Sequence, residues 1–278
     1  MKKINRRSFL AAAGLTAAAL ALTACGSSAS STASSTASSA ASSEAASTSA
    51  AAELTTVEAG KLTMATNAAF PPYEMTTDAG EFEGIDIDTA KAIAEKLGLE
   101  LQIDDMDFDA ALLSVQQGKA DIVMAGVTVT DERKAVMDFS DSYATGIQSI
   151  IVPEGSDITS PDDLAGKKIG TQRGTTGYIY CSDDFGDDAV VAYDDGLTAV
   201  QALKNGQVDA VVIDNAPAKE FVAANPGLVI LDTSYAEEDY AIGLAKGSAL
   251  EDAVNAALEE LKADGTLQSI VDKYITAE

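Results

Sequence analysis

Apolar residues along this chain occur in two kinds of run, which predict strands and helices in alternation. Continuous runs of four to seven residues, bounded by glycine or acidic residues, predict buried strands. Longer stretches with apolar residues at every third or fourth position predict helices. The predicted strands are residues 61–66, 99–103, 121–125, 147–152, 168–171, 190–193, 208–214, 228–231 and 240–246. The predicted helices include residues 87–97, a helix capped by Asp109 that runs to Gln117, and a short helix that begins at Ser160. Residues 249–274 are predicted to be helical with an interruption at Asp264-Gly265. This last segment has Ala253, Ala257, Leu258 and Leu261 on one face. This order is typical of an α/β protein.

One unit of the pattern occurs twice. Residues 114–124 (SVQQGKADIVM) and 202–212 (ALKNGQVDAVV) each contain the end of an apolar-faced helix, a glycine, and an aspartate before a buried strand. The two aspartates, Asp121 and Asp209, lie 88 positions apart. Coincidence is the alternative, because helix, glycine and strand follow one another in many α/β proteins. We expect each of two lobes to use the unit once, with residues 147–152 passing between them.

Polar residues follow the ends of these strands, and open α/β sheets bind ligands beyond the carboxyl ends of their strands. The positions to examine are therefore Asn67, 126–128, 172–176 and Asp214. Residues 172–177 also open a helix, which presents backbone amides to an anion. Phe70 and Phe108 lie just past strands, where phenylalanine usually belongs to the core. Because the chain has seven phenylalanines and no tryptophan, we expect these two to be flat walls for a ligand side chain.

Arg133 occupies an unfavourable place for a cation. Thr130 is the predicted N-cap of a helix with Asp131 and Glu132 in its first turn, so Arg133 lies near the positive end of that helix. The helix dipole disfavours a cation there by roughly 0.3–1 kcal/mol. A surface ion pair with one of the two acids is one interpretation. The nearby Gly126, which lets a ligand approach the backbone, favours a bound carboxylate, which a guanidinium binds through two parallel hydrogen bonds.

Asp214 ends the apolar run 211–213, and it either caps the helix that begins at Asn215 or directs its carboxylate into a cleft. Taken with Arg133 in the other lobe, it predicts a site with opposite charges on opposite walls. Such a site matches the ammonium and carboxylate groups of a free amino acid. Burying either charge unpaired costs several kcal/mol, so the ligand and the walls need one another.

Composition limits the alternatives. A chain of 278 residues, 46% of them hydrophobic, is long enough for two cores. Its formal net charge of −26 argues against nucleic acid as a partner, because phosphates need a basic surface. It contains no histidine, which excludes Ser-His-Asp and Cys-His catalytic units and disfavours a transition-metal site. We therefore expect no metal and no cofactor.

The N-terminal region reads as an export signal followed by a tether. In residues 1–24, four basic residues and no acidic ones accompany an apolar stretch that is too short to prefer a membrane-spanning role. The run Leu22-Thr23-Ala24-Cys25 resembles a bacterial lipoprotein processing site, with Cys25 as the lipid attachment residue; Arg6-Arg7 leaves both the twin-arginine and the general route open. Residues 25–57 are predicted to be this cysteine and a disordered Ser/Ala/Thr tether. Removing residues 1–24 changes the net charge to −30.

Residues 62–274 resemble the extracytoplasmic solute-binding proteins of polar amino-acid ABC importers. The resemblance rests on the motifs TNAAFPPYE (66–74), GIDID (84–88), AGVTVTDER (125–133), DFSD (138–141), GTT (174–176) and VVID (211–214). It implies a two-lobed, type II periplasmic-binding-protein-like clamp, in which helices flank a mixed sheet in each lobe and two crossover strands join the lobes. Lobe 1 would comprise residues 58–144 and 241–278, and lobe 2 residues 145–240.

The resemblance also implies a function and a set of ligand contacts. The protein would bind a free amino acid and pass it to an ABC permease. It would be an exported monomer, lipid-anchored to the outer face of the cytoplasmic membrane in an extracellular or periplasmic location. The ligand carboxylate would be bound by Arg133 and by the amides of Thr128 and Thr176. The ligand ammonium would be bound by Asp214, the Gly126 carbonyl and the Thr128 hydroxyl. The remaining implied contacts are Asn67, Phe70, Phe108, Ala125 and Gln172, which surround the ligand side chain.

One departure from the family pattern affects ligand choice. Many members carry aspartate where this chain has Asn67, so we expect a neutral polar amino acid to be favoured over a basic one. Two alternatives to import remain. A dehydratase-like enzyme on the same fold would need an acid over the ligand, for which Glu74 is the candidate. A receptor ectodomain would need a partner that transmits the signal. We expect a binding protein and no enzyme.

Overall fold

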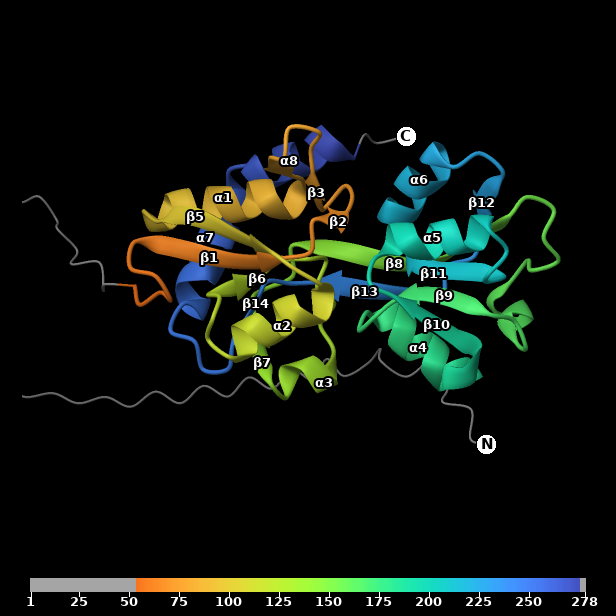
Figure 1. Cartoon of the computed structure of the whole chain (residues 1–278). Coiled ribbons are helices and arrows are strands. Elements are labelled where there is room, and N and C mark those ends of the chain that lie inside the picture. Colours follow the sequence, from red (N-terminus) through yellow and green to blue (C-terminus); the bar gives the residue numbers. More distant parts are fainter. Residues whose placement is uncertain (1–53, 276–278) are drawn as a thin grey trace, which may run out of the picture. The chain divides into compact units, whose positions relative to one another are not determined.

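The computed structural model describes residues 54–275. The predicted export signal, Cys25 and most of the predicted tether lie outside these residues. Among residues 54–275 the strands form two larger sheets and one small one (Figure 1), with the orders β5-β1-β6-β14-β7, β10-β9-β11-β8-β12 with β13 beside β8, and β2-β3-β4. We call lobe 1 the part built on the first sheet and lobe 2 the part built on the second.

Lobe 1 takes its strands from two separate stretches of the chain. Its helices α1, α7 and α8 pack together on one side, and α2 covers β1, β6 and β14 on the other (Figure 1). The small sheet adjoins α1. Its elements are β1 (Lys61–Thr66), β2 (Ala69–Phe70), β3 (Glu74–Thr76), β4 (Phe82–Glu83), α1 (Ile85–Leu97), β5 (Glu100–Asp105), α2 (Phe108–Gln116), β6 (Ile122–Val123), α3 (Asp131–Lys134), β7 (Met137–Phe139), β14 (Gly243–Ala245), α7 (Glu251–Ala263) and α8 (Thr266–Tyr274).

Lobe 2 is formed by the intervening stretch of chain. Helix α4 packs on one face of its sheet, and α5 and α6 pack on the other. Its elements are β8 (Ala144–Pro153), η1 (Pro161–Leu164), β9 (Ile169–Gln172), α4 (Thr176–Phe185), η2 (Asp187–Ala189), β10 (Val190–Tyr193), α5 (Gly196–Lys204), β11 (Ala210–Asp214), α6 (Asn215–Ala224), β12 (Leu228–Ile230) and β13 (Ala236–Tyr240).

Both lobes use the repeated unit in the same way. In lobe 1, α2 is followed by Gly118 and by β6, which pairs in parallel with β1; in lobe 2, α5 is followed by Gly206 and by β11, which pairs in parallel with β9. Both glycines have positive φ, 65° and 67°, as expected just past a helix end. The following aspartates also act alike, since Asp121 accepts the Thr63 amide and Asp209 the Lys168 amide, each at 2.7 Å. The prediction of one unit per lobe is confirmed.

The central strands are continuously apolar because both of their faces are covered. On β11, Val212 packs in the cluster that contains Cys181 of α4, whereas Val211 and Ile213 pack in the cluster that contains Phe221 of α6. Successive strand residues point to opposite faces, so a strand between two layers of helices needs apolar residues at every position. The strand therefore carries its one charge at its end, Asp214, where the sheet stops.

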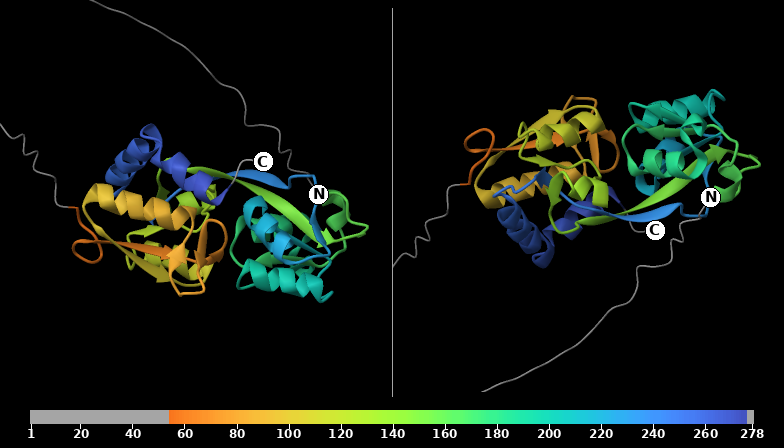
Figure 2. Two further views of the ribbon diagram at one scale, coloured as in Figure 1. Left: turned by 90° about the horizontal axis from the view of Figure 1, so that it is seen from above. Right: turned by 90° about the horizontal axis from the view of Figure 1, so that it is seen from below.

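Two antiparallel strands connect the lobes. β8 and β13 pair from Ala144 with Tyr240 to Gln148 with Ala236, and Figure 2 shows them side by side between the two groups of helices. The predicted lobe boundaries, 144/145 and 240/241, remain a prediction; in the structure β8 begins at Ala144 and β13 ends at Tyr240. Residues 54–275 include no helix with the length and apolar character needed to cross a bilayer.

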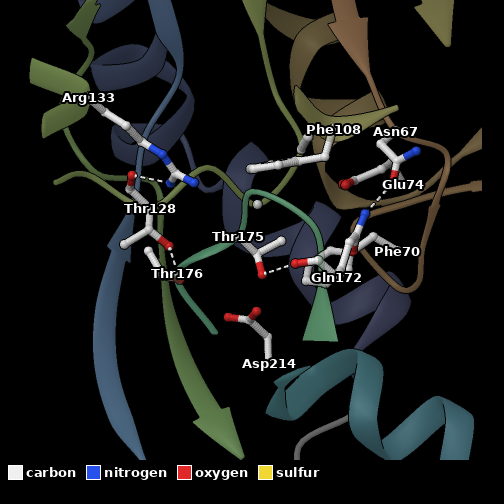
Figure 3. Close-up of a pocket in the computed structure, with 12 residues that line it drawn as sticks. Asn67, Phe70, Glu74, Phe108, Thr128, Arg133, Gln172, Thr175, Thr176 and Asp214 are labelled. Carbon is white, nitrogen blue, oxygen red and sulfur yellow. Dashed lines mark hydrogen bonds between the residues drawn. The ribbon is translucent and has the colours of Figure 1, made fainter. Parts of the chain in front are cut away.

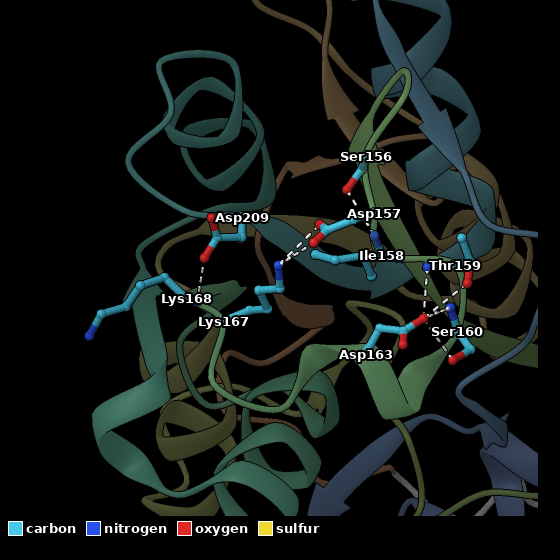
Figure 4. A network of polar contacts seen from close by, with 9 residues as sticks. All are labelled: Ser156, Asp157, Ile158, Thr159, Ser160, Asp163, Lys167, Lys168 and Asp209. Carbon is cyan, nitrogen blue, oxygen red and sulfur yellow. Dashed lines mark hydrogen bonds and ion pairs between the residues drawn. The ribbon is translucent and has the colours of Figure 1, made fainter.

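Local polar bonds hold the outer edge of lobe 2 (Figure 4). Ser160 and Asp163 form a capping box at η1, in which Oδ2 of Asp163 accepts the amides of Thr159 and Ser160 at 3.0 Å. These bonds lower the pKa of Asp163 from its ordinary value. The predicted serine cap followed by a proline in the first turn is confirmed.

The structure differs from the prediction at several element ends. The N-cap of α2 is Asp107, and Asp109 lies in the first turn; an acid complements the helix dipole at either place, so composition does not distinguish them. The predicted strand 240–246 is interrupted, because the amides of Ala241 and Ile242 bond to loops of lobe 1. The buried face of α7 includes Val254 in place of the predicted Ala253, which is only half-buried. The short strands β2, β3, β4 and β7, and the acidic strand β13, were not predicted.

Candidate functional site

One pocket between the lobes collects all the predicted ligand-binding positions (Figure 3). Its lining also includes two residues that were not predicted as ligand contacts, Glu74 and Thr175. The predicted positions that line it are Asn67, Phe70, Phe108, Ala125, Gly126, Thr128, Arg133, Gln172, Thr176 and Asp214. They come together because they end or follow β1, β5, β6, β9 and β11, whose carboxyl ends meet here. Their role as ligand contacts stays a prediction.

Arg133 is buried, with 8% of its surface exposed, and the Thr130 hydroxyl accepts its amide as the N-cap of α3. Its Nη1 donates to the Thr128 carbonyl at 2.7 Å and its Nη2 to the Gly174 carbonyl at 3.1 Å. The interpretation as a surface ion pair with Asp131 or Glu132 is wrong: among residues 54–275 no ion pair includes this guanidinium.

The environment of Arg133 leaves room for an anion. The guanidinium carbon lies 5.3 Å from the centre of the Phe108 ring, a cation–π contact. Two of its five N–H donors bond to backbone carbonyls, so three remain. Burial lowers the pKa of Arg133 from its ordinary value, while the negative charge of Glu238 acts in the opposite direction. A buried guanidinium without an ion-pair partner is costly, so the arrangement favours a carboxylate ligand.

Asp214 is 7% exposed and approaches the pocket from a different side than Arg133 (Figure 3). Asp214 is the N-cap residue of α6, as one interpretation predicted, but its side chain makes no capping bond to that helix. Instead Tyr240 donates its hydroxyl to Oδ1, and Gln148 donates Nε2 to Oδ2 at 2.8 Å. Burial, followed by the charge of Glu238, raises the pKa of Asp214 to about 7. A nearby ammonium would therefore favour the ionised form of this carboxyl.

Amide side chains from the two lobes meet on another wall. Oδ1 of Asn67 accepts Nε2 of Gln172 at 2.8 Å, and Nδ2 of Asn67 donates to the Met106 carbonyl at 3.0 Å. Thr175 is the N-cap of α4, where its hydroxyl accepts the Tyr178 amide and donates to the Gln172 carbonyl. Gln172, the last residue of β9, is thus held by bonds to Asn67 in lobe 1 and to Thr175 in lobe 2.

Gly126 is needed for a reason that differs from the predicted one. Its φ is +55°, and a Cβ there would lie 2.9 Å from the Phe70 ring, so glycine allows the ring to pack onto the backbone. The Gly126 amide donates to Asp86 at 3.0 Å, and Tyr143 donates its hydroxyl to the other oxygen of Asp86 at 2.7 Å. Burial raises the pKa of Asp86 to about 6.

Glu74 is fully buried and lines the pocket. Neither carboxyl oxygen makes a hydrogen bond within the described part of the chain. Burial, and then the neighbouring Asp86, raise the pKa of Glu74 well above its ordinary value. Burial beside Asp86 therefore favours the neutral, protonated form of this carboxyl over the ionised form.

Two further polar residues beside the site were missed by the sequence analysis. Gln148 on β8 and Glu238 on β13 are 1% and 6% exposed, and they bond to each other at 3.0 Å. Gln148 carried a signal, as a polar residue inside an apolar run. Glu238 carried none, because it lies between two exposed acids, Glu237 and Asp239.

Comparison with known proteins agrees with this geometry. The model of the bacterial extracellular solute-binding proteins, family 3, matches residues 62–277. The chain belongs to this family. The predicted resemblance is thereby confirmed, as is the type II periplasmic-binding-protein fold. The family assignment makes the chain a solute-binding protein rather than an enzyme, so the dehydratase alternative is not favoured.

Individual members of the family resemble this solute-binding protein over most of its length. A probable histidine-binding protein of Neisseria gonorrhoeae is 32% identical, over 99% of this chain and 98% of its own. The arginine-, lysine-, histidine-binding protein ArtJ of Geobacillus stearothermophilus is 34% identical with a TM-score of 0.75, over 78% of this chain and 96% of its own. An ancestral arginine-binding protein bound to glutamine is 43% identical with a TM-score of 0.75, over 78% and 99%.

Proposed function

We propose that this protein binds a polar L-amino acid between its lobes and delivers it to an ABC permease for import. The observation that carries the proposal is the pair of buried, opposite charges, Arg133 and Asp214, that line one pocket. A free amino acid carries a carboxylate and an ammonium group one carbon apart, and so offers a partner to each. Relatives whose names record amino-acid binding support the same class of ligand.

The pocket suggests an orientation for this ligand. The ligand carboxylate accepts hydrogen bonds from the free donors of Arg133 and from the amides of Thr128 and Thr176. The ligand ammonium binds to Asp214, the Gly126 carbonyl and the Thr128 hydroxyl. The side chain lies between Phe70 and Phe108, beside Ala125. Asn67 and Gln172 meet its tip through their amides.

Within this class we propose a neutral polar ligand. Asn67 and Gln172 carry no charge, and the raised pKa of Glu74 favours the neutral form of that carboxyl, so this wall offers little counter-charge to a cationic side chain. The ancestral arginine-binding protein bound to glutamine supports the idea that a site of this kind accepts a neutral amide.

Import follows from a population shift. Bonds across the pocket, such as Arg133 to Gly174 and Asn67 to Gln172, form only when the lobes lie close together. A ligand that contacts both walls binds the closed arrangement of the lobes more tightly than the open one. It stabilises the closed arrangement by this difference in binding free energy. The permease then distinguishes loaded protein from unloaded protein by its shape.

The cellular setting is part of the proposal. Residues 1–24 direct export, Cys25 carries the lipid, and the tether holds a monomer near the outer face of the cytoplasmic membrane, in an extracellular or periplasmic location. These N-terminal residues lie outside the part that the structure describes, so this proposal rests on the sequence motif.

Calorimetric titration of the purified protein with the twenty L-amino acids tests the proposal. We expect a neutral polar amino acid to bind most tightly and to be recovered chemically unchanged. Tightest binding of arginine would refute the neutral preference alone. Failure of every amino acid to bind would refute the function, and a chemically altered ligand would point to an enzyme.

A further inference from the structure

Glu238 joins both lobes and both crossover strands through one oxygen atom. Its Oε2 accepts the hydroxyl of Thr128 in lobe 1 at 3.1 Å and the hydroxyl of Thr176 in lobe 2 at 3.0 Å. The same atom accepts Nε2 of Gln148 on β8 at 3.0 Å. The Glu238 side chain is 6% exposed but is not among the residues that line the pocket. It therefore acts on a ligand through its neighbours.

These bonds determine what the two threonines offer to a ligand. A hydroxyl has a single hydrogen, and in both threonines it is directed to Glu238. Nε2 of Gln148 donates to the Thr176 oxygen at 3.4 Å, and the other oxygen lone pairs of the two threonines are left to accept hydrogen bonds. The two hydroxyl oxygens lie 3.5 Å apart, one from each lobe, so they form a paired acceptor only when the lobes are together. An ammonium group supplies the donors that such a pair needs.

The charge of Glu238 acts on the same end of the pocket. It raises the pKa of both Arg133 and Asp214, although burial is the larger cause for Asp214. Its second oxygen, Oε1, is buried and makes no hydrogen bond within residues 54–275. The site thus holds two carboxyls near one binding position for a cation.

We propose that Glu238 is a positioning residue that ties lobe closure to recognition of the ligand's ammonium group. It orients Thr128 and Thr176 as acceptors, one from each lobe, and its charge helps to set the ionisation of Asp214. The inference rests on the proposed function, because it requires an amino-acid ligand.

A pH readout separates this role from a purely structural one. If Asp214 must be ionised to bind an ammonium, its pKa of about 7 makes binding about tenfold weaker at pH 6 than at pH 8. Removing the charge at 238 lowers that pKa and flattens the profile. Other charged or titratable groups near Asp214 are the same in every variant compared; they are Tyr240, Arg133, Tyr73, Glu74, Lys219 and Glu220.

The test uses Glu238→Gln, Glu238→Ala and the matched control Glu237→Gln, titrated with the amino acid that binds the parent most tightly. Glu237 is the preceding residue of β13 and is exposed, so its variant makes the same charge change outside the site. We expect Glu238→Gln, whose amide oxygen still accepts the threonines, to keep affinity at pH 8 and to reduce the pH 8 to pH 6 ratio below about threefold. We expect Glu238→Ala to weaken binding at pH 8 by about 10- to 100-fold.

Two outcomes overturn the inference. One is a Glu238→Gln pH profile that matches the parent and the control. The other is a folded Glu238→Ala that binds as tightly as the parent at pH 8. If Glu238→Ala does not fold, the Glu238→Gln profile decides alone. An unmodified protein that binds no amino acid would contradict the proposed function instead, so the two failures are distinguishable.

Discussion

Asn67 of lobe 1 and Gln172 of lobe 2 share a 2.8 Å hydrogen bond across the pocket. Both residues follow or end a central strand of their own sheet, and both are buried. Gln172 Nε2 also donates to the Asp194 carbonyl at 3.3 Å, and Asn67 Nδ2 donates to the Met106 carbonyl at 3.0 Å. Oε1 of Gln172 and one N–H of Asn67 remain for a ligand. In the proposed function, this neutral pair links lobe closure to the recognition of the ligand side chain.

Asn67→Asp is expected to change the ligand preference towards basic amino acids. The aspartate still accepts Gln172, but it adds a negative charge to a wall that otherwise holds neutral amides and Glu74, whose raised pKa favours its neutral form. We expect the ratio of arginine to glutamine affinity, measured by calorimetry, to rise about tenfold or more. Asn205→Asp, at an exposed position of lobe 2, adds the same charge away from the pocket and serves as the control. An unchanged ratio would show that residue 67 does not meet the ligand side chain.

Arg133→Ala should weaken the binding of every amino acid by about 10²- to 10³-fold, because it removes the partner of the ligand carboxylate. The free energy of unfolding without ligand should change by no more than roughly 1 kcal/mol, since the loss of two hydrogen bonds is offset by the removal of a buried charge without an ion pair. Arg173→Ala is the control, because that arginine is exposed, with 56% of its side chain accessible. Thermal melts with and without ligand measure both effects, and equal affinity in Arg133→Ala would place the site elsewhere.

The stability of this protein should decrease as the pH rises above about 4. Asp86 and Glu74 have raised pKa values in the folded protein, so they keep protons that the unfolded chain releases. Unfolding then releases protons, and the free energy of unfolding falls with rising pH until the folded pKa is passed. For Asp86, a rise from 3.8 to about 6 corresponds to roughly 3 kcal/mol.

Glu74→Gln tests the origin of this pH dependence. The variant should match the parent near pH 4 and be more stable than the parent above pH 5. Glutamine does not ionise in either state, whereas Glu74 loses its proton when the parent unfolds, and this stabilises the unfolded chain. Denaturant titrations at pH 4, 5.5 and 7.5 measure the difference. Glu81→Gln, at an exposed position before β4, controls for the net charge. A parallel pH profile in Glu74→Gln and the parent would contradict the assignment.

Cys25→Ala should release the exported protein from the membrane fraction of the producing cells. In the proposed setting a lipid on that cysteine supplies the apolar anchor, and residues 54–275 contain no helix long and apolar enough to cross a membrane. Fractionation followed by immunoblotting measures the change, and mass spectrometry of the mature N-terminus identifies the lipid. Membrane association that persists in the variant would require another anchor.

Local patterns predicted much of this architecture. The end of β1 at Thr66, the end of β11 at Asp214 and the glycine after α2 were all predicted, because apolar runs and helix stops act within a few residues. The pocket positions were predicted for a related reason. In an α/β sheet the carboxyl end of a strand is already the place where a ligand binds, so knowing the strand ends was enough to name Asn67, Gln172 and Asp214.

The network behind the pocket depended on the tertiary structure. Nothing within a few residues of Glu238 distinguishes it from its acidic neighbours; its burial follows from the antiparallel register that sets it opposite Gly146 on β8. The pKa of Glu74 likewise rises only when the chain folds around it and Asp86 comes near. Sequence patterns determined which residues end strands and helices, because those signals are local. Lobe packing decided which polar groups lose water and meet, because burial and pKa depend on neighbours distant in the chain.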